Sequence, residues 1–169
     1  NRVAITWINY DKKKPSSCSG NGAGWAEERL IYPASVVKII YGIACEAWLQ
    51  KDLLQESSEL RRANTEMIQK SNNDATGLVV DLLTGTTSGP SLVGDGWETW
   101  KKQRLVINTW LSNLGWPELK KVNCSQKTWS HGPFGRDNDF YGPDNGNRNA
   151  LTTAAIARVL EAIMTNALV

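Results

Sequence analysis

One long apolar segment limits the folds that are open to this chain. Residues 35–49 are almost entirely apolar and are interrupted only by Lys38, Gly42 and Glu46. The segment is shorter than the roughly 18 apolar residues of a membrane helix, so we expect a helix buried in a globular core. A chain of 169 residues with 41% hydrophobic content is large enough to bury such a helix within one domain.

The start of this segment carries a serine and a lysine in the pattern Ser-x-x-Lys. On a helix, Ser35 and Lys38 would lie on one face with about 5 to 6 Å between their Cβ atoms. Apolar neighbours would disfavour the charge of the Lys38 amine and free its lone pair, so Lys38 is a candidate base for a Ser35 nucleophile. Free N–H groups at the helix start would favour an oxyanion. The alternative is that Ser35 caps the helix and Lys38 is solvated.

A second polar group separates two predicted helices. Ser71, Asn72 and Asn73 interrupt residues 67–83, which otherwise have a helical pattern. Short polar side chains compete with the backbone for hydrogen bonds, so they favour turns and helix caps and can direct several donors and acceptors into a cleft. The three residues are therefore either ordinary caps or part of a site.

These two motifs together resemble the active-serine superfamily of class A β-lactamases and penicillin-binding proteins, whose motifs are Ser-x-x-Lys, Ser-Asp-Asn and Lys-Thr-Gly. Residues 2–11 and 24–28 resemble the family's first strand and its hairpin partner, and residues 147–157 resemble the segment that follows its omega loop. The resemblance implies one domain over residues 1–169 with an α+β fold of the β-lactamase/transpeptidase type. In this fold a helical region packs on an antiparallel sheet, of which the chain supplies the first strands.

The resemblance also implies a serine hydrolase with an acyl-enzyme intermediate. Ser35 would attack the carbonyl, Lys38 would take its proton, Ser71 would pass a proton to the leaving nitrogen, and Asn73 would bind the substrate amide. Asn72 stands where the family has Asp, and we expect it to support the loop. The implied substrate is a β-lactam or a peptidoglycan-type peptide, and the implied location is the periplasm or another extracytoplasmic site. No cofactor and no metal are implied.

The first departure from the family concerns deacylation. Class A β-lactamases use an omega-loop glutamate to activate the water that hydrolyses the acyl-enzyme. No glutamate lies between Glu118 and Glu161, and the loop offers only Asp137, Asp139 and Asp144, which read as solvated turn residues. Slow deacylation would favour a D-alanyl-D-alanine carboxypeptidase or a penicillin-binding protein over a β-lactamase.

The second departure is the absence of Lys-Thr-Gly. The string Lys127-Thr128-Trp129 precedes the late helix and has a bulky Trp where the family needs Gly, so we reject it as the third motif. A two-stranded hairpin is marginal alone, and we expect a missing C-terminal segment to complete the sheet. The missing glutamate and the missing motif leave open a non-catalytic binding or sensor domain on the same fold.

Other functional classes find little support in the sequence. The net charge is only +2, whereas a nucleic-acid binder would carry a strongly basic stripe. The only histidine, His131, follows no Gly-x-Ser-x-Gly elbow, and we interpret it as a loop residue rather than as part of a Ser-His-Asp triad. The cysteines lack the close spacing of a metal site. If two of them pair, Cys18 with Cys124 is the better candidate, because Cys45 lies in the apolar helix.

The remaining expectations concern secondary structure and tryptophan packing. We predict helices near residues 60–70 and 105–114, and a final helix capped by Thr152 or Thr153, but a long irregular loop over residues 123–149. Trp129 lies in this loop, at the mouth of the cleft that the resemblance implies. Four tryptophans fall in predicted strands or helices and are interpreted as core or supporting residues: Trp7, Trp25, Trp48 and Trp110.

Overall fold

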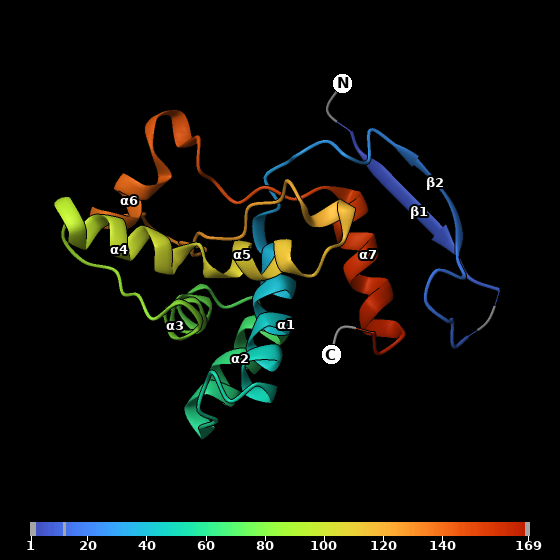
Figure 1. Ribbon diagram of the computed structural model, residues 1–169, viewed down its shortest axis with the longest axis horizontal. Helices are drawn as coiled ribbons and strands as arrows, with labels where there is room; N and C mark the ends of the chain where they lie inside the picture. Colours follow the sequence, from blue (N-terminus) through green and yellow to red (C-terminus); the bar gives the residue numbers. More distant parts are fainter. Residues whose placement is uncertain (1–2, 12, 168–169) are drawn as a thin grey trace.

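A computed structural model describes residues 3–11 and 13–167 of the chain. Within these residues, seven α-helices and one two-stranded antiparallel sheet form an α+β structure (Figure 1). The expected α+β class is confirmed at this level. The elements in chain order are β1 (Ile5–Asn9), β2 (Asn21–Trp25), η1 (Ala34–Val36), α1 (Val37–Gln50), α2 (Ser58–Lys70), α3 (Asn73–Thr84), α4 (Gly94–Arg104), α5 (Val106–Asn113), η2 (Pro117–Leu119), α6 (Gly135–Tyr141), η3 (Pro143–Asn145) and α7 (Thr153–Met164), where η marks a short 3-10 helix.

Helix α1 is the buried helix that the apolar segment predicts. Val37, Ile40, Tyr41, Ala44 and Cys45 are fully buried and recur at the spacing of one helical face. Helices α2 and α3 pack against α1, and Figure 1 shows α7 on its other side. The start of α1, where Lys38 lies, is thereby enclosed by the core.

The hairpin at the other end of the molecule is covered on one face by α7. Thr6 of β1 lies 2.8 Å from Thr153 of α7 between their Oγ1 atoms. Ile5 pairs with Trp25 across the strands, so both side chains lie on the opposite face, together with Trp7. Trp7 and Trp25 are each 61% exposed. Their interpretation as packing residues is wrong, because no described element covers that face.

The other two tryptophans of that group do support the core. Trp48 is buried and contacts the half-buried Trp110 edge to face, with 5.4 Å between ring centroids. The predicted first strand is present as β1, although Arg2 at the start of the predicted range lies outside the described residues. Residues 147–157 lead into the late helix α7, as expected. Thr152 caps this helix by accepting a hydrogen bond from the Ala155 N–H.

Two helices were missed by sequence reasoning. Helix α4 is polar and begins with Gly94, and α6 is a short helix inside the predicted irregular loop. Aromatic contacts join them: Trp100 of α4 meets Phe140 of α6 edge to face, with 5.3 Å between centroids. Partners far apart in the chain stabilise these helices, and local periodicity does not report such partners.

Two further expectations concern the cysteines and membrane-spanning helices. Cys18 is exposed, Cys45 and Cys124 are buried, and all three are free, so the suggested Cys18–Cys124 pair does not form. The Cys18 N–H donates to Glu161 in α7, whereas the Cys124 N–H donates to Asn108 in α5, which holds the two residues on different elements. No helix among the described residues has the length and apolarity needed to cross a membrane.

Candidate active site

The site is built on the sharp turn between α2 and α3. Ser71 ends α2 in the left-handed conformation, with φ 54°, and its N–H donates to the Glu66 carbonyl. Asn72 then begins α3 as its cap, because its side chain accepts from the Ala75 N–H at 3.0 Å. The chain thus reverses within two residues, and the expectation that Asn72 supports this loop is confirmed by its capping bond.

The turn presents three acceptors to the amine of Lys38. Lys38 Nζ donates to the Ser71 carbonyl at 2.6 Å, to Asn73 Oδ1 at 2.8 Å and to Ser71 Oγ at 3.1 Å. Lys38 is only 3% exposed, so the reading of this lysine as solvated is wrong. Three of the four candidate site residues therefore meet at one point.

The electrostatics of this amine are unusual for a lysine. None of the ion pairs between described residues includes Lys38, and its three partners are formally neutral oxygens. Burial lowers the pKa of the Lys38 ammonium, since desolvation penalises the charged form. When the amine is neutral, it keeps two N–H donors for the carbonyl oxygens and can accept a proton from the Ser71 hydroxyl.

Ser35 stands apart from this network. It is exposed and lies in η1, before α1 begins at Val37, rather than in the first turn of the α-helix. Ala34 precedes it with φ 46°, a backbone conformation that costs a residue with a side chain about 1 to 2 kcal/mol. Among the hydrogen bonds between described residues, none joins Ser35 to Lys38; the amine is held by Ser71 and Asn73 instead. No side chain of the described residues caps the start of α1.

Asn73 connects the lysine to a cavity on the other side of the turn. Its Oδ1 accepts from Lys38, and its Nδ2 donates to Ser130 Oγ at 3.2 Å. A cavity of about 500 Å³ opens there, which we call the Asn73 cavity. Its walls include Asn73, Gly77, Lys127, Trp129, Ser130 and His131. The expectation that Trp129 lies at a cleft beside the candidate site agrees with this placement.

A buried ion pair fixes the wall of the Asn73 cavity. Lys127 is 7% exposed, and its Nζ donates to Asp81 Oδ2 of α3 and to Ser88 Oγ, each at 2.7 Å. Burial raises the pKa of the Asp81 carboxyl, and the Lys127 ammonium acts in the opposite direction. In the rejected string Lys127-Thr128-Trp129, the lysine therefore has a structural role, because it joins the loop to α3.

A second group of hydrogen bonds holds the same loop to α1. The Tyr41 hydroxyl of α1 donates to the Gln126 carbonyl at 2.6 Å. The Asn149 side chain accepts from the N–H groups of Ser125 and Gln126 and donates to that same carbonyl. Asn149 and Tyr41 are buried, so these bonds are shielded from water. The loop that carries Ser130 to Asn73 is thus fixed at Gln126 as well as at Lys127.

The three loop aspartates lie away from Asn73. Asp137 is fully buried and pairs with the fully buried Arg104 at 3.2 Å, so its interpretation as a solvated residue is wrong. Arg104 reaches it because α4 and α6 pack together. Asp139 and Asp144 are exposed as expected, and none of the three lines the Asn73 cavity.

Sequence reasoning missed two residues. Ser130 binds Asn73, and Asp81 binds Lys127. Ser130 could be found only as one polar residue of a polar loop, and Asp81 only as a charge within an apolar helix. Their partners lie 57 and 46 residues away along the chain. Nothing in the local pattern reports those contacts.

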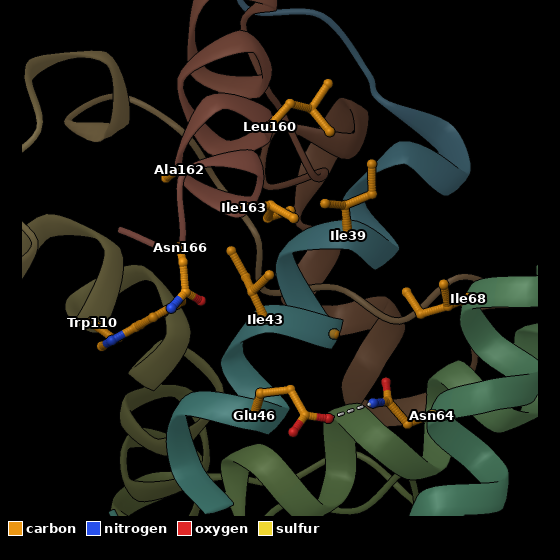
Figure 2. A pocket seen from close by; sticks show the side chains of 11 residues that line it. Ile39, Ile43, Glu46, Asn64, Ile68, Trp110, Leu160, Ala162, Ile163 and Asn166 are labelled. Carbon is orange, nitrogen blue, oxygen red and sulfur yellow. Dashed lines mark hydrogen bonds between the residues drawn. The ribbon is translucent and has the colours of Figure 1, made fainter. Parts of the chain in front are cut away.

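An apolar groove lies along a different face of α1 (Figure 2). Ile39 and Ile43 of α1 line it together with Ile163 of α7. Glu46 and Asn64 form a hydrogen bond at its polar end, with Asn64 Nδ2 donating at 3.2 Å. Lys38, Ser71 and Asn73 do not line this groove, which separates it from the candidate site.

Comparison with known proteins finds no matching family model, no matching curated protein and no matching solved structure.

Proposed function

We propose that this chain is a serine acyl-hydrolase in which Ser35 forms an ester with a β-lactam or a related amide. The observation that carries the proposal is the buried Lys38 amine, which contacts both Ser71 and Asn73 and has no carboxylate partner among the described residues. A lysine in this setting can be neutral and can act as a base, whereas an ion-paired lysine cannot.

Each residue has one task in the proposed reaction. The Lys38 amine takes the proton of the Ser35 hydroxyl as Ser35 Oγ bonds to the amide carbon. Ser71 passes a proton from the Lys38 side to the leaving nitrogen, since its hydroxyl already contacts that amine at 3.1 Å. Asn73 Nδ2, which points to Ser130 in the free protein, exchanges this partner for the substrate carbonyl.

Ser35 must approach Lys38 for this reaction to begin. Its exposed position in η1 leaves it accessible to a substrate. Contacts of a catalytic pair are often loose in a free enzyme and tighten when substrate binds. The resemblance to an exported family supports the periplasm or another extracytoplasmic site as the location of the proposed reaction.

The intact mass of the protein, measured before and after incubation with benzylpenicillin, tests the proposal. We expect a mass increase of one penicillin, mapped to the peptide that contains Ser35, or consumption of the drug with a transient adduct. Ser35→Ala should abolish both. Ser112→Ala removes an exposed hydroxyl from α5 and serves as the matched control. An adduct on another residue, or no adduct and no consumption, would refute the assignment.

A penicillin-binding role with slow release is the second candidate. It is favoured by the positions of Asp137, Asp139 and Asp144, none of which lines the Asn73 cavity. A long-lived Ser35 adduct, or release of D-alanine from a D-alanyl-D-alanine peptide, would support this candidate over a β-lactamase. A non-catalytic sensor is the outcome if binding occurs without any Ser35 ester.

A further inference from the structure

We propose that the apolar groove on α1 binds a small amphiphilic amine, with the apolar chain along the groove and the ammonium group at Glu46. The groove has a volume of about 460 Å³, within the range of about 300 to 1,000 Å³ that is typical of small-ligand sites. None of the residues that line it also lines the Asn73 cavity. The inference therefore does not depend on the proposed function.

One face of α1 forms the floor of this groove. Its members follow the i, i+3, i+4, i+7 pattern of a single helical face: Ile39, Gly42, Ile43 and Glu46. Only the last of them has a polar side chain. Seven residues of α-helix rise by about 10 Å. The floor is therefore apolar along most of its length and carries a carboxylate at one end.

Exposed aliphatic side chains from two other helices form the sides of the groove. Ile68 comes from α2, and Leu160 and Ile163 come from α7. Figure 2 shows Ile163 on one side of Ile39 and Ile68 on the other. Removing exposed apolar surface from water is favourable, so an alkyl chain that lies between the two helices would be stabilised by both.

The polar end of the groove offers a carboxylate oxygen for a cationic head group. Glu46 is the one charged residue among the described residues that line the groove. Its Oε1 accepts from Arg61 Nη1 at 2.7 Å and from Asn64 Nδ2 at 3.2 Å. None of the hydrogen bonds between described residues uses Glu46 Oε2, so this oxygen can accept from a ligand.

Asn64 adds a second acceptor that lacks a donor. A carboxylate only accepts, so Glu46 holds the Asn64 nitrogen toward itself and leaves Oδ1 on the other side of the amide (Figure 2). This oxygen is buried and has no hydrogen-bond partner among the described residues. A Cβ on Gly42 would lie 3.7 Å from Asn64 Oδ1 and 3.0 Å from Ile68 Cδ1. A ligand donor reaches the oxygen when the Ile68 side chain turns aside.

The local charge favours a cation over an anion. Arg61 contacts Glu46 at 2.7 Å and Glu56 at 2.6 Å, so one cation faces two carboxylates and the three groups carry one net negative charge. An alkylammonium group has one positive charge and three N–H donors, and its pKa is close to that of lysine. It therefore complements both the charge and the two acceptors.

The short floor favours a small ligand over a helix of a partner protein. A helix of 12 to 15 residues is about 18 to 22 Å long, roughly twice the length of the floor. Only one end of the groove carries a charge, which matches a ligand with a single head group. A short alkyl chain with a terminal ammonium group has both properties.

Titration with n-octylamine at about pH 7, followed in the ¹H–¹³C methyl spectrum of isoleucine-labelled protein, tests the location of the site. We expect saturable shifts, with one ligand per chain, at the methyl groups of the isoleucines that line the groove: Ile39, Ile43, Ile68 and Ile163. Ile107 is fully buried outside the groove, and Ile8 lies in β1. Their methyl groups are internal controls and should not shift.

The head-group preference tests the role of Glu46. n-Octylamine should bind about tenfold more tightly than n-octanoate, because one head group is attracted and the other repelled, and high salt should reduce this ratio. Glu46→Gln should reduce the ratio to about twofold or less and leave the binding of 1-octanol unchanged. Glu98→Gln changes an exposed carboxylate of α4 outside the groove and should keep the native ratio.

The apolar contacts can be tested with the same three probes. Ile163→Ser should weaken the binding of all three by about fivefold or more, because the alkyl chain loses an apolar wall. Leu53→Ser removes an exposed aliphatic side chain outside the groove and should leave all three affinities unchanged. The methyl spectrum of each variant without ligand shows whether it is folded.

Four outcomes would overturn the inference. The first is equal affinity for octylamine and octanoate, and the second is a native ratio in Glu46→Gln. The third is a set of shifts that grow without saturation and include Ile107 and Ile8, since these would indicate nonspecific detergent binding. The fourth is a shift of the groove methyl groups with protein concentration alone, which would show that a second copy of the chain occupies the groove. None of these outcomes bears on the serine hydrolase proposal, because neither Ser35 nor a β-lactam takes part in the tests.

Discussion

Two lysines of this protein are almost equally buried, yet their surroundings differ in kind. Lys38 is 3% exposed and has three formally neutral oxygens as partners, whereas Lys127 is 7% exposed and donates to the Asp81 carboxylate. Both lie beside Asn73, Lys38 through a hydrogen bond and Lys127 across the Asn73 cavity. Burial alone therefore does not distinguish a lysine that has a counter-ion from one that does not.

The counter-ion makes the difference between the two. A buried ammonium beside a carboxylate keeps its charge and holds two elements together. A buried ammonium without one is destabilised by desolvation and is ready to give up its proton. In this molecule Lys127 is of the first kind and fixes the loop that carries Ser130. Lys38 is of the second kind, and the Ser71 hydroxyl lies within hydrogen-bond distance of its amine.

Replacing Lys38 should have the largest effect on the proposed chemistry. Lys38→Arg keeps a positive charge but offers a group that does not lose its proton, so acylation of Ser35 by benzylpenicillin should fall by about 10²- to 10⁴-fold. Lys70→Arg, at an exposed lysine that pairs with Glu66 in α2, is the matched control and should acylate normally. Native acylation by Lys38→Arg would show that the amine is not the base.

Replacing Lys127 should instead affect stability most. Lys127→Met leaves the partly exposed Asp81 with only its more distant cation, Arg104 at 3.5 Å, and we expect a loss of about 1 to 3 kcal/mol in the free energy of unfolding. Urea unfolding measures this loss. Adding Asp81→Asn should recover part of it, and Lys70→Met should cost less than about 0.5 kcal/mol. Equal losses for Lys127→Met and Lys70→Met would contradict the comparison.

The pH profile of acylation should report the state of Lys38. Burial lowers the pKa of this ammonium, so its neutral fraction is larger at neutral pH than that of an ordinary lysine. Below that lowered pKa, the acylation rate should rise with pH by about tenfold per unit, and it should level off before an ordinary lysine would titrate. A rate that is flat or falls with rising pH would argue against a lysine base.

The cap of α3 should give the smallest effect. Asn72→Ala removes the bond to the Ala75 N–H and should cost about 1 kcal/mol in the free energy of unfolding. Thr152→Ala removes the equivalent cap of α7 and should cost a similar amount. Only Asn72→Ala should also slow acylation, because Asn72 lies between Ser71 and Asn73. Equal acylation rates in the two variants would show that the turn tolerates the loss of its cap.

The parts of the fold that follow from the sequence are those with local causes. The spacing of Val37, Ile40 and Tyr41 predicts the buried face of α1, and the short polar run at Asn72 predicts a helix start. The sequence also suggests that Lys38, Ser71 and Asn73 act together, although only through a resemblance. Their meeting in space depends on how α1 packs against the turn between α2 and α3.

The parts that could not be predicted depend on distant partners. Alternation in β1 separates Trp7 from Thr6, but it does not tell which face α7 will cover. The buried state of Asp137 depends on Arg104, which comes from a polar helix without a clear periodic signal. Ser130 reaches Asn73 only because the loop is tied at Lys127 and Asn149.

The left-handed backbone of Ser71 has a consequence for how the protein can change. This single residue binds Lys38 twice, once through its carbonyl and once through its hydroxyl. Glycine would adopt φ 54° more easily than serine and would keep the carbonyl, so the turn itself has no need of the hydroxyl. Retaining serine here sacrifices some conformational ease for a hydroxyl that contacts the Lys38 amine. If the proposed chemistry were lost, glycine could take this position and relieve the strained backbone, at the cost of greater backbone freedom in the unfolded chain.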